Sequence, residues 1–308
     1  MPHKKIVFLV LPQMHLLDLA GPDQVFHEAL DYGADLSIEY CSLGENLQTS
    51  SEFPLGRLKN FSEITLQAGD YLIIPGASVE FLVSKRMAAE KELIKWVNAS
   101  HAKGVNVCSI CTGAFFLALT GLLNGRKCTT HWKRTTELKK RFPAIILVED
   151  ILFTEEDRIY TSAGVTAGID LALFILGRLT DENLSYKVAR ELVVYLRRIG
   201  SASQQSIFMK YRNHIHSGIH KAQDYVHENI RKKVSLNQLA EKACMSPRNL
   251  TRTFKKETGI TVNEYTNLIR KEMLREFAKN PDMSRRQMAK ECGLNSERHV
   301  IRLLKSAE

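Results

Sequence analysis

SLNQLAEKACMSPRNLTRTFKK, residues 235–256, is the stretch that decides how the second half of this chain folds. A second copy, SRRQMAKECGLNSERHVIRLLKS, follows at residues 284–306. The alignment allows a one-residue insertion and pairs these residues: Leu239 with Met288, Cys244 with Gly293, Ser246 with Ser296, Arg248 with Arg298, Arg252 with Arg302 and Lys255 with Lys305. The chain therefore repeats one structural unit.

Each copy is predicted to open with a helix. Ser235 with Gln238, and Ser284 with Gln287, match the capping box, in which a Ser oxygen and a Gln side chain satisfy free amides at a helix start. A tight turn and a second helix follow, so each copy is predicted to be a helix-turn-helix.

The second helix of the first copy is predicted to begin after Ser246, because Pro247 suits the first helical position. Leu250 and Phe254 are four residues apart and face the core. The opposite face suits a DNA major groove, although a solvated basic face on an ordinary hairpin is the alternative. Across both copies we expect these DNA contacts: Arg248, Asn249, Thr251, Arg252, Lys255, Lys256, Arg298, His299, Arg302 and Lys305.

A single helix is predicted between the copies. Thr261 and Glu264 form another capping box, and residues 262–279 contain neither Gly nor Pro. At about 1.5 Å per residue this helix spans roughly 27 Å. That length is comparable with the roughly 34 Å between successive major grooves on one face of a duplex.

Residues 215–308 resemble the DNA-binding domain of the AraC/XylS transcriptional regulators, most specifically in the run MSPRNLTRTFKKETG at 245–259. That family joins two helix-turn-helix units by one long helix. The second unit departs from the pattern, because Leu304 stands where an aromatic residue is usual and no closing Gly-x-x-Pro-x-x-Tyr helix follows. We expect Leu303 or Leu304 to be partly exposed and the first unit to supply most of the specificity.

Charge divides the chain. Residues 201–308 carry 21 Lys and Arg against 11 Asp and Glu, whereas residues 1–200 carry 22 against 23. A basic region behind a neutral one is typical of a nucleic-acid binder with a separate function in front. Gly-Ser-Ala-Ser-Gln-Gln at 200–205 interrupts the periodicity. The expected segments are a sensor and dimerisation domain over 1–199, a linker over 200–213 and a DNA-binding domain over 214–308, with double-stranded DNA as the partner.

The front half is predicted to form an open, mostly parallel α/β sheet of the flavodoxin-like class. Continuous apolar runs at 6–11, 71–74 and 105–110 suit strands that are buried on both faces. Alternation with helices implies layers on both sides of the sheet. The predicted helices cover 21–32, 88–103, 111–122, 133–142, 165–179 and 184–198.

Cys111 follows the third of these runs directly and is predicted to project from a sharp strand-to-helix turn. Ligands in such sheets sit beyond the carboxyl ends of the strands. A thiol at a helix N-terminus favours the thiolate. Cys111 is therefore a candidate nucleophile, redox sensor or ligand contact, and a small buried hydrophobic residue is the alternative.

This half resembles the ThiJ/PfpI superfamily in LLDLAGP at 16–22, IPG at 74–76, CTGA at 111–114, TTHW at 129–132 and SAGVTAGID at 162–170. Together with the second half, it is similar to the GlxA-like regulators. The resemblance implies a front domain that senses a small nitrogenous metabolite, an amino acid or a quaternary amine, and that forms a homodimer. The residues expected to bind this effector are Asp18, Gly76, Ala77, Cys111, Thr112 and His131.

An enzyme is the competing interpretation. Peptidase-like members of the superfamily place a His after the nucleophile, whereas Thr112 stands there in this chain. Isonitrile hydratases share the Asp of the LLDLAGP run and the Cys-Thr-Gly motif, so Asp18, Cys111 and Thr112 form a possible hydratase set. We expect sensing rather than catalysis, and therefore no catalytic residues.

Neither a metal nor a cofactor is expected. His216, His220 and Asp224 share helical spacing, but a polar helix start is the favoured interpretation. Cys108 and Cys111 form a C-x-x-C motif, yet Cys108 lies within the strand and should face the core.

A cytoplasmic protein is expected. The chain begins without a recognisable signal peptide, and its most apolar stretches, 108–123 and 165–179, are short and interrupted. The six cysteines suit a reducing compartment, and no membrane partner is expected.

Overall fold

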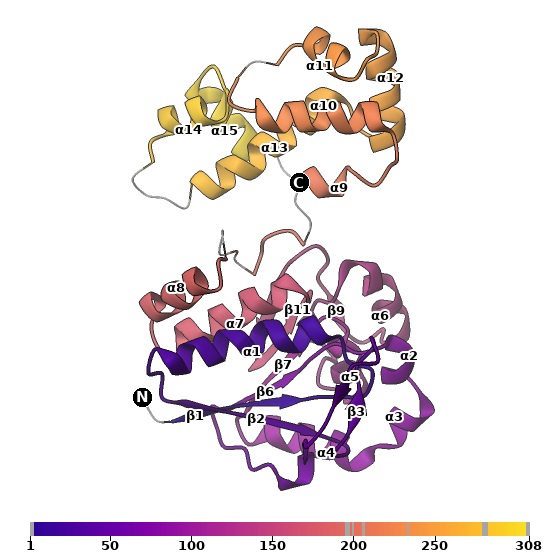
Figure 1. Cartoon of the computed structure of the whole chain (residues 1–308), viewed down its shortest axis with the longest axis vertical. Coiled ribbons are helices and arrows are strands. Elements are labelled where there is room, and N and C mark those ends of the chain that lie inside the picture. The colour runs from indigo at the N-terminus through magenta and orange to yellow at the C-terminus, as the bar shows by residue number, and fades with distance from the viewer. Residues whose placement is uncertain are drawn as a thin grey trace. The chain divides into compact units, whose positions relative to one another are not determined.

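The computed structural model describes residues 3–194, 198, 200–204, 207–232, 234–278 and 283–305. The chain forms two compact units, Met1–Gln204 and Gln205–Glu308, each treated by itself (Figure 1).

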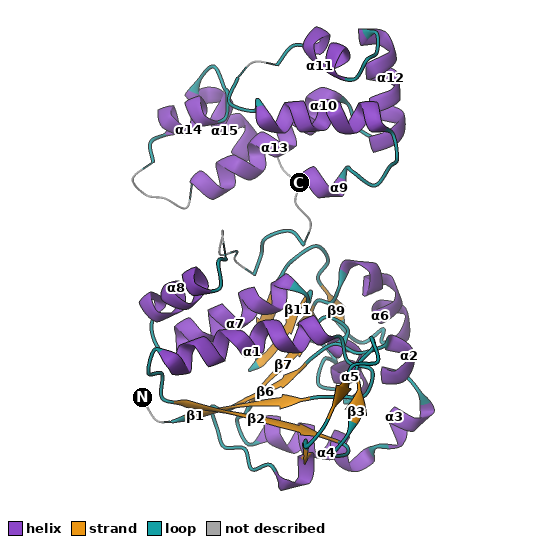
Figure 2. Cartoon of the chain, in the orientation of Figure 1, coloured by secondary structure: helices purple, strands orange, loops and turns teal. Residues whose placement is uncertain are grey.

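The first unit alternates strands and helices (Figure 2). Its strands are β1 (Lys4–Leu9), β2 (Leu36–Ser42), β3 (Leu47–Gln48), β4 (Pro54–Leu55), β5 (Lys59–Asn60), β6 (Tyr71–Ile74), β7 (Asn106–Ile110), β8 (Lys127–Cys128), β9 (Ile146–Leu147), β10 (Phe153–Glu156) and β11 (Ile159–Ser162). Its helices are α1 (Leu16–Asp31), α2 (Val79–Leu82), α3 (Lys85–Ala89), α4 (Lys91–Ala102), α5 (Gly113–Leu119), α6 (Thr135–Arg141), α7 (Thr166–Leu179) and α8 (Glu182–Glu191), with 3-10 turns η1 (Phe61–Glu63) and η2 (Trp132–Arg134).

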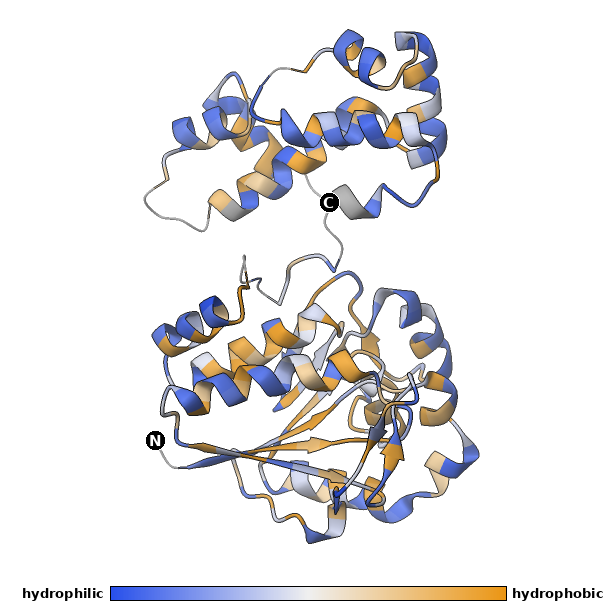
Figure 3. Cartoon of the chain, viewed as in Figure 1, coloured by the Kyte–Doolittle hydropathy of each residue, from blue (hydrophilic) through white to orange (hydrophobic). Residues whose placement is uncertain are grey.

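Seven strands make the main sheet, in the order β10-β11-β7-β6-β1-β2-β5. All neighbours pair in parallel except β10 with β11. Helices α1, α7 and α8 lie on one face and α4 on the other (Figure 1). The central strands β6 and β7 are buried along their whole length and mostly hydrophobic (Figure 3), because a parallel sheet covered on both sides exposes neither face. The predicted open, mostly parallel sheet is confirmed.

The predicted start of the first helix at Gly21 was wrong, because α1 begins at Leu16 and contains Pro22. Proline normally marks a first turn, since it lacks an N–H. Here both residues pack against α7. A Cβ on Gly21 would lie 2.9 Å from Ile169, and one on Gly168 would lie 3.3 Å from Pro22. Close packing of two helices therefore explains this Gly-Pro pair, rather than a helix start.

Two further helix predictions differ from the structure. The expected helix over 88–103 begins at Lys91, because Ser84 caps a separate short helix, α3, before it. The expected helix over 184–198 begins at Glu182, where the Asp181 side chain caps it, and ends at Glu191. Residues 195–197 lie outside the described residues.

The second unit is helical throughout its described elements. These are α9 (Ile207–Lys210), α10 (Ser217–Glu228), α11 (Leu236–Lys242), α12 (Pro247–Thr258), α13 (Val262–Phe277), α14 (Arg285–Glu291) and α15 (Glu297–Lys305). All three predicted capping boxes are confirmed, at the starts of α11, α13 and α14. The predicted connecting helix is α13, which ends at Phe277, while residue 279 lies outside the described residues.

Helix α13 belongs to two hydrophobic cores. Its Tyr265 packs with Leu250 and Phe254 of the first helix-turn-helix, and its Leu274 packs with Val300 and Leu303 of the second. One continuous helix therefore joins the two repeats. In the described part of the chain, no helix is both long and apolar enough to cross a bilayer.

Candidate functional site

The Cys111 turn has the sharp backbone that the sequence predicts. Strand β7 ends at Ile110 and α5 begins at Gly113, so two residues make the connection. Cys111 has φ 56°, in the left-handed region, and its N–H donates to the Ser162 carbonyl at 2.9 Å. A non-glycine residue in this region costs roughly 1–2 kcal/mol, and such strain concentrates at functional sites.

Two glycines let other segments approach this turn. A Cβ on Gly164 would lie 2.1 Å from the Cys111 Cβ. A Cβ on Gly76 would lie 2.5 Å from Asp18 Oδ2 and 2.8 Å from Thr112 Oγ1. Four of the predicted effector residues therefore meet at one point, which we call the Cys111 crevice: Asp18, Gly76, Cys111 and Thr112.

Asp18 is buried in this crevice, with an exposed fraction of 1%. Its Oδ1 accepts a hydrogen bond from the Val165 N–H at 2.7 Å. Its Oδ2 has no hydrogen-bond partner among the described residues, and His15 Nδ1 lies 3.5 Å away. His15 was not among the predicted site residues. It lies three residues before Asp18, and at a helix start this spacing puts both side chains on the same face.

The thiolate prediction for Cys111 was wrong. Burial raises the pKa of this thiol well above its usual range, and the negative charge of Asp18 raises it further. The amide and hydroxyl of Thr112 lower the pKa but do not compensate for these two effects. Cys111 is thus a neutral thiol at neutral pH.

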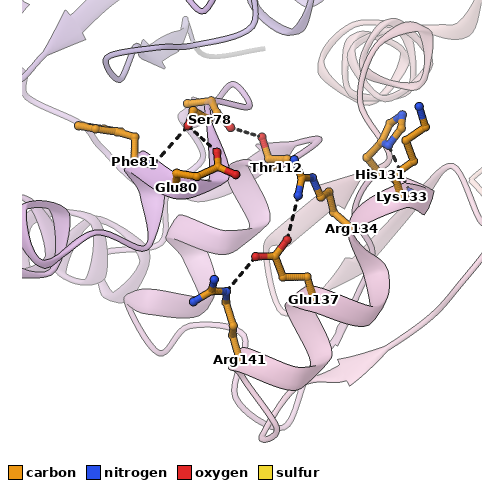
Figure 4. A network of polar contacts seen from close by, with 10 residues as sticks. Ser78, Glu80, Phe81, Thr112, His131, Lys133, Arg134, Glu137 and Arg141 are labelled. Atoms are coloured by element: carbon orange, nitrogen blue, oxygen red, sulfur yellow. Dashed lines mark hydrogen bonds and ion pairs between the residues drawn. The ribbon is translucent and has the colours of Figure 1, made fainter.

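Thr112 and Ala77 are joined by a hydrogen bond, in which Thr112 Oγ1 donates to the Ala77 carbonyl at 2.7 Å. Ser78 follows Ala77 and caps α2, accepting from the Phe81 N–H at 3.3 Å (Figure 4). Because the threonine hydroxyl is used within the protein, it holds the loop after β6 against the Cys111 turn.

His131 is half-buried and caps η2, where its Nδ1 accepts from the Lys133 N–H at 3.4 Å (Figure 4). Burial lowers the pKa of this imidazole, with a further contribution from Lys133, while Asp18 raises it. Within the described residues, no hydrogen bond joins His131 to Asp18 or Cys111. It stands beside the crevice together with the exposed Trp132, whose ring centre is 5.7 Å away.

The three polar residues near the start of the second unit each have a contact within the protein. His216 Nδ1 accepts from the Ile219 N–H at 3.4 Å and so caps α10, while Asp224 forms an ion pair with Arg212. His220 packs against His214, with ring centres 4.4 Å apart. Cys108 is fully buried, as expected for a strand residue facing the core.

Helix α12 presents a basic outer face. Leu250 and Phe254 are fully buried, as predicted from their spacing. Asn249 Oδ1 accepts a hydrogen bond from Arg252 Nη2 at 3.2 Å, which steadies that guanidinium. Exposed residues line an open groove along this face: Arg248, Thr251, Arg252, Lys255 and Lys256.

Helix α15 presents a smaller set of exposed basic residues. Arg298, Arg302 and Lys305 are exposed, and Arg302 Nη2 lies 2.9 Å from His299 Nε2. Leu303 is buried at 8% exposure, whereas Leu304 is 37% exposed. The expected partial exposure therefore falls on Leu304.

Known proteins match both units. Residues 4–178 match the DJ-1/PfpI family, and residues 226–267 match bacterial regulatory helix-turn-helix proteins of the AraC family. The chain is 27% identical over 220 residues to the HTH-type transcriptional regulator GbdR of Pseudomonas aeruginosa, a match that covers 70% of this chain and 59% of that protein. The chain thus spans less than two thirds of the length of this relative.

Two more known proteins resemble this chain. The chain is 28% identical over 194 residues to the isonitrile hydratase of Pseudomonas putida, covering 61% of this chain and 77% of that enzyme. A solved ThiJ/PfpI family protein from Pseudomonas syringae superposes with a TM-score of 0.56 at 22% identity, covering 79% of this chain and 90% of that one, and supports the fold alone. Because the family match spans more than half of the sequence, the chain belongs to the DJ-1/PfpI family and carries an AraC-family helix-turn-helix segment behind it.

Proposed function

We propose that this protein is a cytoplasmic transcriptional regulator that binds double-stranded DNA and senses a small nitrogenous metabolite in the Cys111 crevice. The observation that carries the proposal is the exposed basic face of α12, set on a helix whose opposite side is fully buried. Basic residues of such a helix neutralise phosphates, and the residues near its start reach base edges. Helix α15 supplies a second reading face, with Arg298, His299, Arg302 and Lys305 as its contacts.

The DNA proposal is tested by comparing Arg252→Ala with Arg302→Ala in titrations of promoter fragments against random-sequence DNA. Loss of an arginine that reads bases costs about 1–3 kcal/mol, or roughly 5- to 150-fold in affinity. We expect the larger loss from Arg252→Ala, since Asn249 holds that side chain in place and the groove lies on α12. Lys95→Ala, an exposed lysine of α4, serves as the charge control.

Two outcomes contradict the proposal. An equal or larger loss from Arg302→Ala overturns the primacy of the first helix-turn-helix. Equal binding of promoter and random DNA by the wild type rejects sequence-specific regulation altogether.

Sensing is supported by Asp18, whose unpartnered buried oxygen suits the ammonium group of an amino acid or a related amine. A thermal-shift screen of amino acids, betaines and polyamines tests it on wild type and Asp18→Ala. A ligand at 100 times its Kd stabilises the fold by about 2.7 kcal/mol. A ligand that stabilises both proteins equally does not bind at Asp18.

Homodimerisation through the first unit is part of the proposal. Leu16 and Leu17 at the start of α1 are 40% and 49% exposed, and a partner surface would cover them. Sedimentation of the full chain tests this, and a monomer at micromolar concentration contradicts it.

Hydratase activity is the second candidate, favoured by the meeting of Asp18, Cys111 and Thr112 and by the likeness to isonitrile hydratase. The raised thiol pKa argues against a resident nucleophile. Steady turnover of an isonitrile that Cys111→Ala abolishes would place this candidate first.

A further inference from the structure

Three potential metal ligands lie close together at a place where no ion is expected from the sequence. His15, Asp18 and Cys111 each offer one ligand atom, and these atoms all lie within 4.8 Å of one another. His15 is the residue before α1, Asp18 is in its first turn, and Cys111 follows β7. The start of α1 and the end of β7 thus hold a nitrogen, an oxygen and a sulfur ligand close together.

The Asp18 carboxylate is arranged to meet a cation. Val165 fixes one oxygen through its N–H at 2.7 Å, which leaves the other oxygen turned to the cluster. That second oxygen is buried without a hydrogen bond among the described residues. A buried acceptor left unsatisfied costs about 1–3 kcal/mol, and more when it is charged. A cation between Asp18 and Cys111 removes this cost.

The surroundings close the cluster on one side and open it on the other. A Cβ added to Gly76 would lie 2.5 Å from Asp18 Oδ2, and a Cβ added to Gly164 would lie 2.1 Å from Cys111 Cβ. On this side, therefore, the cluster is closed by glycine backbone. The His15 side chain is 39% exposed, whereas that of Asp18 is 1% exposed. The His15 side is therefore the side from which an ion can reach the cluster.

The donor set selects the ion. Nitrogen, oxygen and sulfur donors together suit borderline-soft ions such as Zn²⁺, whereas Mg²⁺ and Ca²⁺ prefer oxygen alone. Ligand atoms around a tetrahedral zinc lie about 3–4 Å apart, given bonds of about 2.0–2.3 Å, so a small closure of the cluster is enough.

We propose that His15, Asp18 and Cys111 form a binding site for a thiophilic divalent cation of the zinc class. The Sγ–H bond breaks, the sulfur lone pair forms the bond to the cation, and the proton leaves to solvent with no change of oxidation state. Three protein ligands leave a fourth position for water or for a donor atom of a metabolite. The proposal goes beyond the proposed function, since binding of the ion needs neither DNA nor metabolite. An ion at Asp18 takes the oxygen that an effector's ammonium group would otherwise meet, so the ion and such an effector compete for the crevice.

Titration of the full chain with Zn²⁺ against a chromogenic chelator, and with Co²⁺ followed by absorbance, tests the site. We expect one ion per chain and a sulfur-to-cobalt charge-transfer band in the near ultraviolet. Asp18→Asn and Cys111→Ser each lower affinity by at least about tenfold, and Cys111→Ser also removes the band. Cys244→Ser is the matched control, since Cys244 is the exposed thiol, and it keeps both signals.

Retention of the band in Cys111→Ser, or of full affinity in Asp18→Asn, overturns the site, as does a wild type that binds no ion. His15→Gln replaces a partly exposed side chain, so it tests the site even if Asp18→Asn or Cys111→Ser fails to fold. It should also lower the affinity for the ion. DNA binding by the metal-free wild type is measured in parallel. Its failure rejects the proposed function, whereas failure of the ion titration rejects only this inference.

Discussion

Cys244 occupies the turn of the first helix-turn-helix at φ 55°, and the aligned Gly293 occupies the second at φ 62°. Only glycine adopts this region without strain. Relief of about 1–2 kcal/mol of strain, less about 0.5–1 kcal/mol of added chain entropy, leaves a net gain between about zero and 1.5 kcal/mol. We therefore expect Cys244→Gly to stabilise the second unit. Slower hydrogen exchange of the α11 and α12 amides measures the gain.

The reverse substitution at the aligned glycine provides the contrast. A Cβ on Gly293 would lie 2.6 Å from the Ile230 carbonyl oxygen, so Gly293→Ala adds a backbone clash to the strained φ. We expect faster exchange in α14 and α15 for this variant. Unchanged protection in both variants would show that neither turn limits the stability of the unit.

His214 gives the second unit a dependence on pH. Burial lowers the pKa of this imidazole, with a further contribution from His220 and opposition from Glu257. The folded state therefore resists protonation, while the unfolded chain binds a proton near pH 6.5. Stability is full above that pH and falls as the pH drops below it.

We expect His214→Gln to flatten this acid dependence below about pH 6.5, the ordinary pKa of a histidine. Hydrogen exchange of the α10 amides at each pH measures it. His227→Gln alters an exposed histidine of the same helix and should leave the slope unchanged. An equal slope in wild type and His214→Gln would assign the acid sensitivity to another group.

At single positions, the sequence predicted the features that depend on local backbone conformation. The strand-to-helix turn at Cys111 and the small residue at Gly76 follow from backbone sterics that the motif carries. The ionisation of Cys111 could not be predicted, because it depends on burial and on Asp18, which is distant in sequence. His15 was missed for a different reason: its contact with Asp18 depends on where α1 begins, and the predicted helix began after both residues.

Helix α15 buries two adjacent leucines unequally. Leu303 is 8% exposed and packs with Val300, whereas Leu304 is 37% exposed. Truncation of a buried Leu to Ala typically costs about 2–5 kcal/mol, and a surface change is usually within about 0.5 kcal/mol. We expect Leu303→Ala to abolish protection of the α14 and α15 amides and Leu304→Ala to leave it nearly intact. Comparable losses would show that both side chains lie in the core.

Among whole elements, periodicity predicted interiors better than ends. The buried strands β6 and β7 and the long α13 follow from apolar runs and helical spacing. The start of α1 did not, because tertiary packing against α7 overrides the usual meaning of Gly-Pro. The limits of the linker between the two units stay a prediction. A Ser-rich stretch indicates a break between domains, but it does not indicate which residues belong to each domain.

Gln204, the last residue of the first unit, is held by hydrogen bonds to residues near the Cys111 crevice. Its Oε1 accepts from the Trp132 N–H at 2.8 Å, and its Nε2 donates to the Thr130 carbonyl at 3.0 Å. The Thr130 hydroxyl in turn donates to the Cys111 carbonyl at 2.8 Å. Asp150 Oδ1 accepts from the Gln204 N–H at 3.1 Å. Hydrogen bonds therefore run from the crevice to the point where the second unit is tethered.

On the scale of the whole molecule, this path predicts that Gln204→Ala uncouples sensing from DNA binding. The substitution removes only the side-chain hydrogen bonds to Thr129, Thr130 and Trp132, so ligand affinity and basal DNA affinity should both persist. Coupling between sites is typically worth about 1–3 kcal/mol, or 5- to 150-fold. The ratio of DNA affinities with and without the amine found in the thermal-shift screen measures it, and in Gln204→Ala this ratio should fall toward one. Gln24→Ala, which removes a surface contact of α1 with Glu28, should keep the wild-type ratio. A full ratio in Gln204→Ala would mean that the signal reaches the DNA-binding unit by another route, because a conformational switch requires a contact that differs between its two states.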